Sequence, residues 1–170
     1  NFRMGAGPFV VEACEYRRHF LHLQPKILVI TNIERDHLDY YRDINDVRSA
    51  FQSLVDTLPS DGVLIINADD SETAKLRLPK CRVITYGLAP TALVKLAEVP
   101  SLAVPGQFNR YNAAAALAVA RQLALTEFVA QHALQTYQGL GRRFEHFADW
   151  HDATIIADYA HHPTAVAATI

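Results

Sequence analysis

Cysteine, charge of one sign and long hydrophobic runs are all scarce in this sequence. The 170 residues include two cysteines and carry a formal net charge of −2. The distant cysteines argue against a thiolate zinc site and favour free thiols in a reducing compartment. The small net charge gives no global attraction to nucleic acid or an anionic membrane. The longest apolar runs are far shorter than the ~20 residues of a membrane-spanning helix. We expect a cytoplasmic protein.

The sequence has the composition of a folded α/β domain. Half of its residues are hydrophobic, which is enough to fill a core. Helical spacing of apolar residues predicts helices at 46–58, with Asn45 as N-cap, at 110–125 and from Thr126 to about Leu134, and a short helix follows Asp70 or Ser71. Continuous apolar runs predict buried parallel strands at 9–13, 27–31, 63–67 and 82–86. Together they predict a mainly parallel sheet flanked by helices.

A second unit begins near the end of the chain. The glycine-containing connector 138–143 is followed by an apolar strand at 154–157 and then by a helix start. We expect a domain boundary near Phe147, with residues 1–147 forming one domain and residues 148–170 beginning another.

Candidate ligand-binding residues lie at the carboxyl ends of the predicted strands, where open α/β sheets bind their ligands. Glu12 follows the first run and suits a hard cation such as Mg²⁺, although a solvated or arginine-paired carboxylate explains it equally. The second run leads into a loop with Asp36 and His37. An imidazole held beside a carboxylate can ligate a metal or act as an acid or base, whereas the alternative is helix capping by Asp36 with His37 exposed.

Other candidates suit a nucleotide. Asn109 and Asn112 lie on one side of a helix start and offer amide groups that match an adenine edge, although Asn109 could instead be an N-cap. Arg142 and Arg143 could bind phosphate bidentately. Asp158 at a strand end could accept hydrogen bonds from a ribose.

Two further imidazoles, His161 and His162, follow that strand end. They belong to no recognisable zinc set such as HExxH.

The order of these segments is more specific than any one of them. Six segments resemble the Mur ligase family across nearly the whole chain: VVEACEY at 10–16, TNIERDHLD at 31–39, NADD at 67–70, PGQFNRYNA at 105–113, GRRFE at 141–145 and DYAHHPT at 158–164. The resemblance implies a central ATP-binding domain followed by the start of a Rossmann-like C-terminal domain. It also implies ATP-dependent formation of an amide through an acyl phosphate. Three segments are most similar to members that join L-alanine to UDP-N-acetylmuramate, and members that add a tripeptide to this sugar are the alternative.

The resemblance also implies roles for individual residues. Glu12 and His37 would ligate Mg²⁺, and His161 would lie near the reacting carboxylate or the incoming amino acid. The nucleotide contacts would come from Asn109 and Asn112 at the adenine, Arg143 and more weakly Arg142 at the phosphate, and Asp158 at the ribose.

The chain departs from the family pattern in several places. No phosphate loop of the form GxxxxGK[ST] occurs. In the family this loop lies upstream of Glu12, so we expect a chain truncated at its start and inactive alone. Phe108 and Ala157 stand where relatives usually have a histidine and an acidic residue, and the segment 87–105 looks short. A non-catalytic nucleotide-binding module and a metal hydrolase built on Glu12, Asp36, His37 and His161 are the alternatives from other classes.

Overall fold

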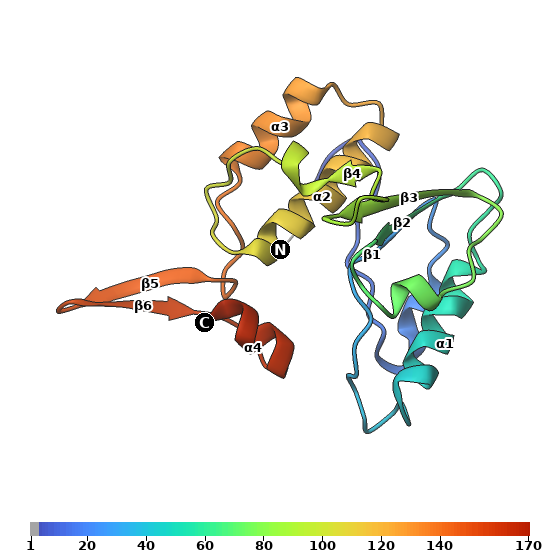
Figure 1. The fold of residues 1–170 in the computed structure, drawn as a ribbon, viewed down its shortest axis with the longest axis horizontal. Helices are drawn as coiled ribbons and strands as arrows, with labels where there is room; N and C mark the ends of the chain where they lie inside the picture. The colour runs from blue at the N-terminus through green and yellow to red at the C-terminus, as the bar shows by residue number, and fades with distance from the viewer. Residues whose placement is uncertain (1–3) are drawn as a thin grey trace.

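A four-stranded parallel sheet lies at the centre of the fold (Figure 1). The structure is a computed structural model that describes residues 4–170. The strands are β1 (Ile27–Ile30), β2 (Val63–Asn67), β3 (Arg82–Gly87) and β4 (Val94–Lys95), and they lie side by side in chain order. The first three confirm predicted strands, whereas the two-residue β4 is too short to leave an apolar pattern. The predicted α/β class with a mainly parallel sheet is confirmed.

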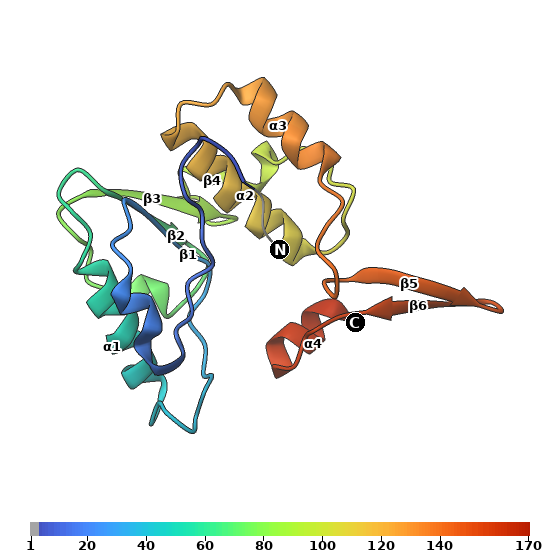
Figure 2. The same cartoon turned by 180° about the vertical axis from the view of Figure 1, so that it is seen from behind.

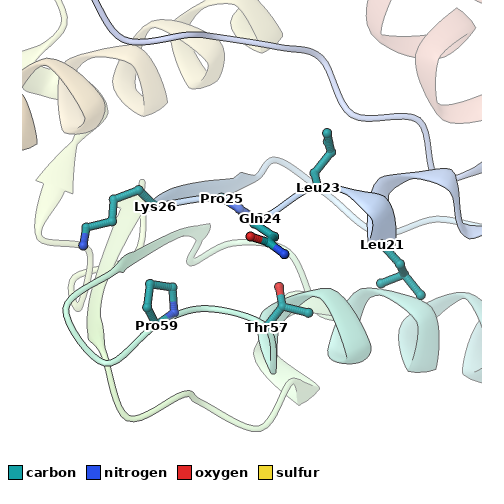
Figure 3. Close-up of a pocket in the computed structure, with 7 residues that line it drawn as sticks. All are labelled: Leu21, Leu23, Gln24, Pro25, Lys26, Thr57 and Pro59. Carbon is teal, nitrogen blue, oxygen red and sulfur yellow. The ribbon is translucent and has the colours of Figure 1, made fainter.

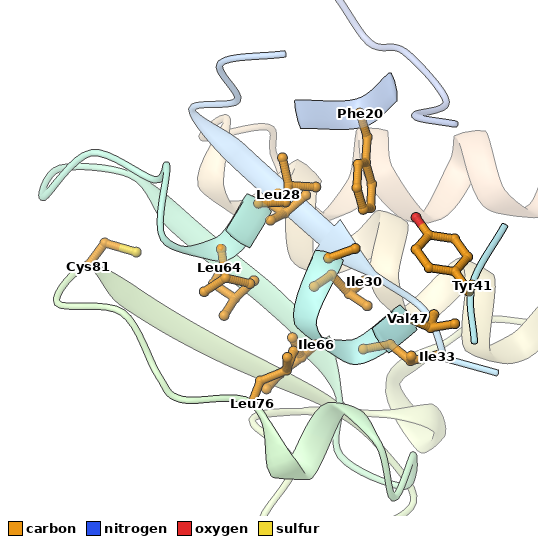
Figure 4. Packing of buried hydrophobic residues seen from close by; sticks show 13 residues of the cluster. Phe20, Leu28, Ile30, Ile33, Tyr41, Val47, Leu64, Ile66, Leu76 and Cys81 are labelled. Atoms are coloured by element: carbon orange, nitrogen blue, oxygen red, sulfur yellow. The ribbon is translucent and has the colours of Figure 1, made fainter. Parts of the chain in front are cut away.

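Helices cover both faces of this sheet (Figures 1 and 2). The 3₁₀ helix η1 (Tyr16–His22) and helix α1 (Ile44–Val55) pack on one face, and α2 (Gln107–Gln122) with α3 (Glu127–Thr136) covers the other. Successive residues of β2 alternate between them: Leu64 packs toward α1, and Ile65 toward α2. Figure 4 shows the cluster on the α1 side, where Phe20 and Tyr41 join the strand residues. Burial on both faces explains why these strands read as continuous apolar runs.

The predicted strand at 9–13 is wrong. These residues pair with no strand within the described range 4–170, and Phe9 and Val10 are 85% and 83% exposed. An apolar run indicates a tendency to be buried, but it does not supply the neighbouring strand whose backbone must complete the hydrogen bonds. In this structure β1 is the edge of the sheet instead.

Two helix starts differ from prediction. Asp43, rather than Asn45, caps α1, because its carboxylate accepts the backbone N–H groups of Asn45 and Asp46. Helix α2 begins at Gln107 after Gly106, so Asn109 is not its cap. Thr126 caps α3 as predicted, accepting the N–H of Val129.

Asp69 and Asp70 hold the loops that follow β2 and β3. Asp70 accepts the N–H of Thr73, the first residue of the predicted short helix η2 (Thr73–Lys75), at 2.7 Å, although Glu72 is the N-cap of that helix. Asp69 accepts the N–H of Leu88 at 2.5 Å and the hydroxyl of Tyr111 at 2.8 Å. Burial, with this hydrogen bond to Asp69, raises the pKa of Tyr111 to about 12. Both carboxylates are therefore structural.

The end of the chain forms a separate hairpin and helix. Strands β5 (Glu145–Trp150) and β6 (Ala153–Ala157) pair antiparallel and extend away from the sheet, and helix α4 (Pro163–Thr169) follows them (Figure 1). β6 confirms the predicted strand at 154–157. The domain boundary near Phe147, which falls within β5, stays a prediction. The short helix η3 (Leu96–Glu98) follows β4.

Within residues 4–170, no helix combines the length and the apolar character that crossing a membrane requires.

Candidate functional site

Carboxylates and imidazoles gather in the loop that follows β1. The backbone of His37 adopts a left-handed conformation with φ of 51°, and its N–H donates to Asp36 Oδ1 at 2.6 Å. The Nε2 atom of His37 lies 3.1 Å from Glu15 Oε1 and 3.5 Å from Asp36 Oδ2. Glu15 precedes η1, so two segments distant in sequence build this group.

The C-terminal histidines reach the same loop. Nε2 of His162 lies 3.0 Å from Asp36 Oδ2, although the two residues are 126 positions apart. The ring of His161 lies 4.4 Å from that of His162, centroid to centroid. Two overlapping groups result, Glu15–Asp36–His37 and Asp36–His161–His162, and the potential ligand atoms of each lie within 4.8 Å of one another.

Asp36 belongs to both groups and is held as a carboxylate. Burial alone would raise its pKa, but the backbone N–H of His37 and the imidazoles of His37 and His162 outweigh burial. The pKa of Asp36 is therefore lowered from its ordinary value. An ionised carboxylate among imidazoles is chemically suited to hold a cation.

The structure brings together some of the predicted site residues and leaves others apart. His37 and His161 meet around Asp36. Glu12 is exposed and makes no side-chain hydrogen bond among the contacts of residues 4–170. Glu15 lies beside His37 instead, and it was missed although it stands in the same EACEY segment.

A second region lies between the connector and the start of α2. A cavity of 550 Å³ is lined by residues 103–105, by connector residues including Arg143, and by Ile156 of β6. Asn109 is adjacent, because its Nδ2 donates to the carbonyl of Pro105 at 2.6 Å, and Asn112 is exposed one turn further along α2. Of the residues predicted to contact a nucleotide, Arg143 therefore lines this cavity, and Asn109 is hydrogen-bonded to a residue that lines it.

Asp158 and the two arginines organise the connector itself. The Asp158 carboxylate accepts the N–H groups of Phe144 and Ala160, both at 2.6 Å. The Arg143 guanidinium carbon lies 5.9 Å from the ring centroid of Tyr159. The backbone N–H of Arg142 donates to Glu145 at 2.7 Å, and its side chain is exposed. Both arginine side chains are accessible to a bound anion.

A further cavity, of 380 Å³, lies at the end of the sheet opposite to the cluster around Asp36 (Figure 3). Leu21, Thr57 and Pro59 help to line it, with the residues that lead into β1. It lies at the amino end of that strand, away from the edge where open α/β sheets bind ligands. We assign it no chemistry.

The chain has a parallel sheet with metal-ligating side chains after its first strand, and an arginine-bearing connector beside a helix start. These features place it in the class of open α/β ligand-binding domains. The sequence matches the Mur ligase middle domain over residues 2–120. The chain belongs to the Mur ligase family.

Curated relatives agree with this assignment. The chain is 36% identical over 194 residues to a UDP-N-acetylmuramate–L-alanine ligase of Lachnospira eligens. The aligned region covers all of this chain and 42% of the relative. It is 39% identical over 183 residues to the enzyme of the same name from an Arthrobacter species. The aligned region covers 95% of this chain and 39% of the relative. The chain thus spans about two fifths of the length of these relatives.

Solved structures share the fold. The UDP-N-acetylmuramate–alanine ligase of Thermotoga maritima superposes with a TM-score of 0.68 at 25% identity, covering 89% of this chain and 38% of that one. MurF from Acinetobacter baumannii gives a TM-score of 0.74 at 22% identity, with 89% and 37% coverage. At that identity, the second comparison supports the fold alone.

Proposed function

We propose that the chain is part of a ligase that uses ATP to join L-alanine to UDP-N-acetylmuramate, a step in the synthesis of peptidoglycan precursors. The similarity to enzymes of that name along the whole chain carries the proposal. The cluster around Asp36 and the arginine-bearing connector are consistent with it, because phosphoryl transfer to a carboxylate gathers negative oxygens that cations must neutralise. We propose a cytoplasmic location, with which two free cysteines agree.

The carboxylates of the cluster after β1 are suitable ligands for Mg²⁺. Mg²⁺ is commonly held by one or two carboxylates together with substrate phosphates, and Glu15 and Asp36 offer oxygens beside His37. We propose His37 and Glu12 as ligands of this ion. Glu15 is a further candidate, and it is the carboxylate that the geometry favours. When bound, Mg²⁺ would neutralise the phosphate oxygens next to the substrate carboxylate.

The proposed reaction has two steps. A carboxylate oxygen of the sugar attacks the γ-phosphorus of ATP, and ADP leaves. The amine of L-alanine then attacks the carbonyl carbon, phosphate leaves, and the amine proton passes to a base. His161 is proposed to lie near these reacting groups. It contacts the Tyr159 carbonyl through Nδ1 at 2.9 Å.

The nucleotide is proposed to lie near the cavity of the connector. Arg143, supported by Arg142, would contact the phosphates, and Asn109 and Asn112 would face the adenine. Asp158 is proposed to accept from the ribose. Its oxygens already accept two backbone N–H groups, but each carboxylate oxygen can accept a second hydrogen bond.

A test of the proposed function is ligation by the full-length protein, given ATP, Mg²⁺ and UDP-N-acetylmuramate, with L-alanine or the tripeptide in separate reactions. We expect ADP to be released only with L-alanine. Release only with the tripeptide would reassign the chain to the tripeptide-adding ligases. Release with neither would contradict ligation and favour a nucleotide-binding module.

A further inference from the structure

We propose that Asp36, His161 and His162 form a site for a divalent transition-metal ion, such as Zn²⁺ or Co²⁺. The bound ion would tie the C-terminal unit, defined as residues 145–170 with β5, β6 and α4, to the loop after β1. The proposal rests on the positions of these three side chains and does not depend on the proposed ligase reaction.

The spacing of the three side chains is close to that of a metal site. Each offers one ligand atom, and these atoms lie within 4.8 Å of one another. His162 Nε2 and Asp36 Oδ2 are 3.0 Å apart. Metal–ligand bonds of about 2 Å in tetrahedral geometry put neighbouring ligand atoms roughly 3.3 Å apart. Entry of an ion would thus need only small movements.

Contacts outside the site orient two of the ligands. His161 Nδ1 lies 2.9 Å from the carbonyl oxygen of Tyr159, which can only accept, so Nδ1 carries the proton and Nε2 presents a lone pair. A metal-binding histidine usually donates its other N–H in this way. Asp36 Oδ1 accepts the His37 N–H at 2.6 Å, which leaves Oδ2 for the ion.

The ligand set selects a transition metal. Two imidazoles and one carboxylate suit Zn²⁺, Co²⁺ and their neighbours, whereas Mg²⁺ prefers oxygen ligands. The neighbouring group, Glu15–Asp36–His37, has two carboxylates and one imidazole. The two groups share Asp36 but differ in the character of their remaining ligands.

An ion here would join segments that are otherwise weakly attached. Across residues 4–170, the contact of His162 with Asp36 is the one side-chain hydrogen bond between the C-terminal unit and any residue before the connector. Replacing it with coordination bonds would strengthen the attachment of the unit. We therefore expect the bound ion to protect the exposed Arg142 and Arg143 of the connector from trypsin.

The test is calorimetric titration of Co²⁺ into the 170-residue chain, with the visible spectrum of the bound ion as a second readout. We expect one ion per chain. His162→Ala and His161→Ala should each weaken binding by about tenfold or more, because even loss of an outer contact costs 10–100-fold. His132→Ala is the matched control, since His132 is exposed on α3, and it should bind normally.

Three outcomes would overturn the proposal: equal binding by His162→Ala and the control, a loss in His37→Asn as large as in His162→Ala, or ready displacement of Co²⁺ by Mg²⁺. Faster cleavage of the connector by trypsin with Co²⁺ bound would overturn the proposed attachment. Circular dichroism checks that each variant folds, and His162→Gln replaces His162→Ala if the latter does not.

Discussion

Replacing His37 with asparagine in the full-length protein is expected to lower the ligation rate by about a hundredfold or more. The imidazole lies 3.1 Å from Glu15, in the group proposed to hold Mg²⁺. Stabilisation by a metal supplies several kcal/mol to such reactions, and each 1.36 kcal/mol corresponds to about tenfold in rate. Asparagine is chosen because position 37 has a φ of 51°, a left-handed conformation that asparagine adopts readily.

The measurement is the turnover number at saturating substrates, with the fold checked by circular dichroism. His132→Asn, on the exposed side of α3, is the matched control and should keep normal turnover. Near-normal ligation by His37→Asn would remove His37 from the proposed metal site. His37→Ala should show the same loss of rate, with an added cost in stability from the strained backbone.

Leu64→Ala is expected to destabilise the fold by about 3 kcal/mol. Leu64 is 0% exposed at the centre of β2 and packs in the cluster between the sheet and α1. Truncating a buried leucine removes its transfer free energy and leaves a cavity, which together cost about 2–5 kcal/mol. A central strand paired on both sides cannot move to close that cavity.

Urea denaturation of the 170-residue chain measures this effect as a lower free energy of unfolding. Leu78→Ala is the matched control, because Leu78 is 59% exposed and should change stability by less than about 0.5 kcal/mol. Equal stability of both variants would contradict the described core.

The strands of the parallel sheet could be predicted because their burial leaves a pattern in the sequence, whereas β6 was predicted from its apolar residues although it is largely exposed. β1 and β2 are largely buried and therefore nearly continuous in Val, Ile and Leu, and the buried part of β3 includes Ile84 and Tyr86. β5 is exposed along nearly its whole length, so it carries no such pattern, and its pairing with β6 was missed. The apolar run at 9–13 predicted a strand where the structure has none.

The site was predictable in its residue types but not in its grouping. His37 and His161 stood out because each follows a strand or a strand-like segment. Their meeting at Asp36 depends on how the connector places the C-terminal unit, which local patterns do not encode. The sequence predicts Glu12 as a ligand because this residue follows an apolar run that was expected to form a strand. The structure has no strand there. The position of a carboxylate in the apolar run therefore does not predict which carboxylate lies beside His37.

The chain-order arrangement of the sheet also bears on how quickly it can form. Each strand pairs with the next strand along the chain, and the connection between β3 and β4 is much shorter than that between β1 and β2. The entropy lost in closing a loop grows with its length, and contacts between distant residues slow folding. The pairing of β2 with β3 encloses a shorter loop than the pairing of β1 with β2, so the sheet can grow from β2 and β3 outward, with β1 and its long helical crossover added last.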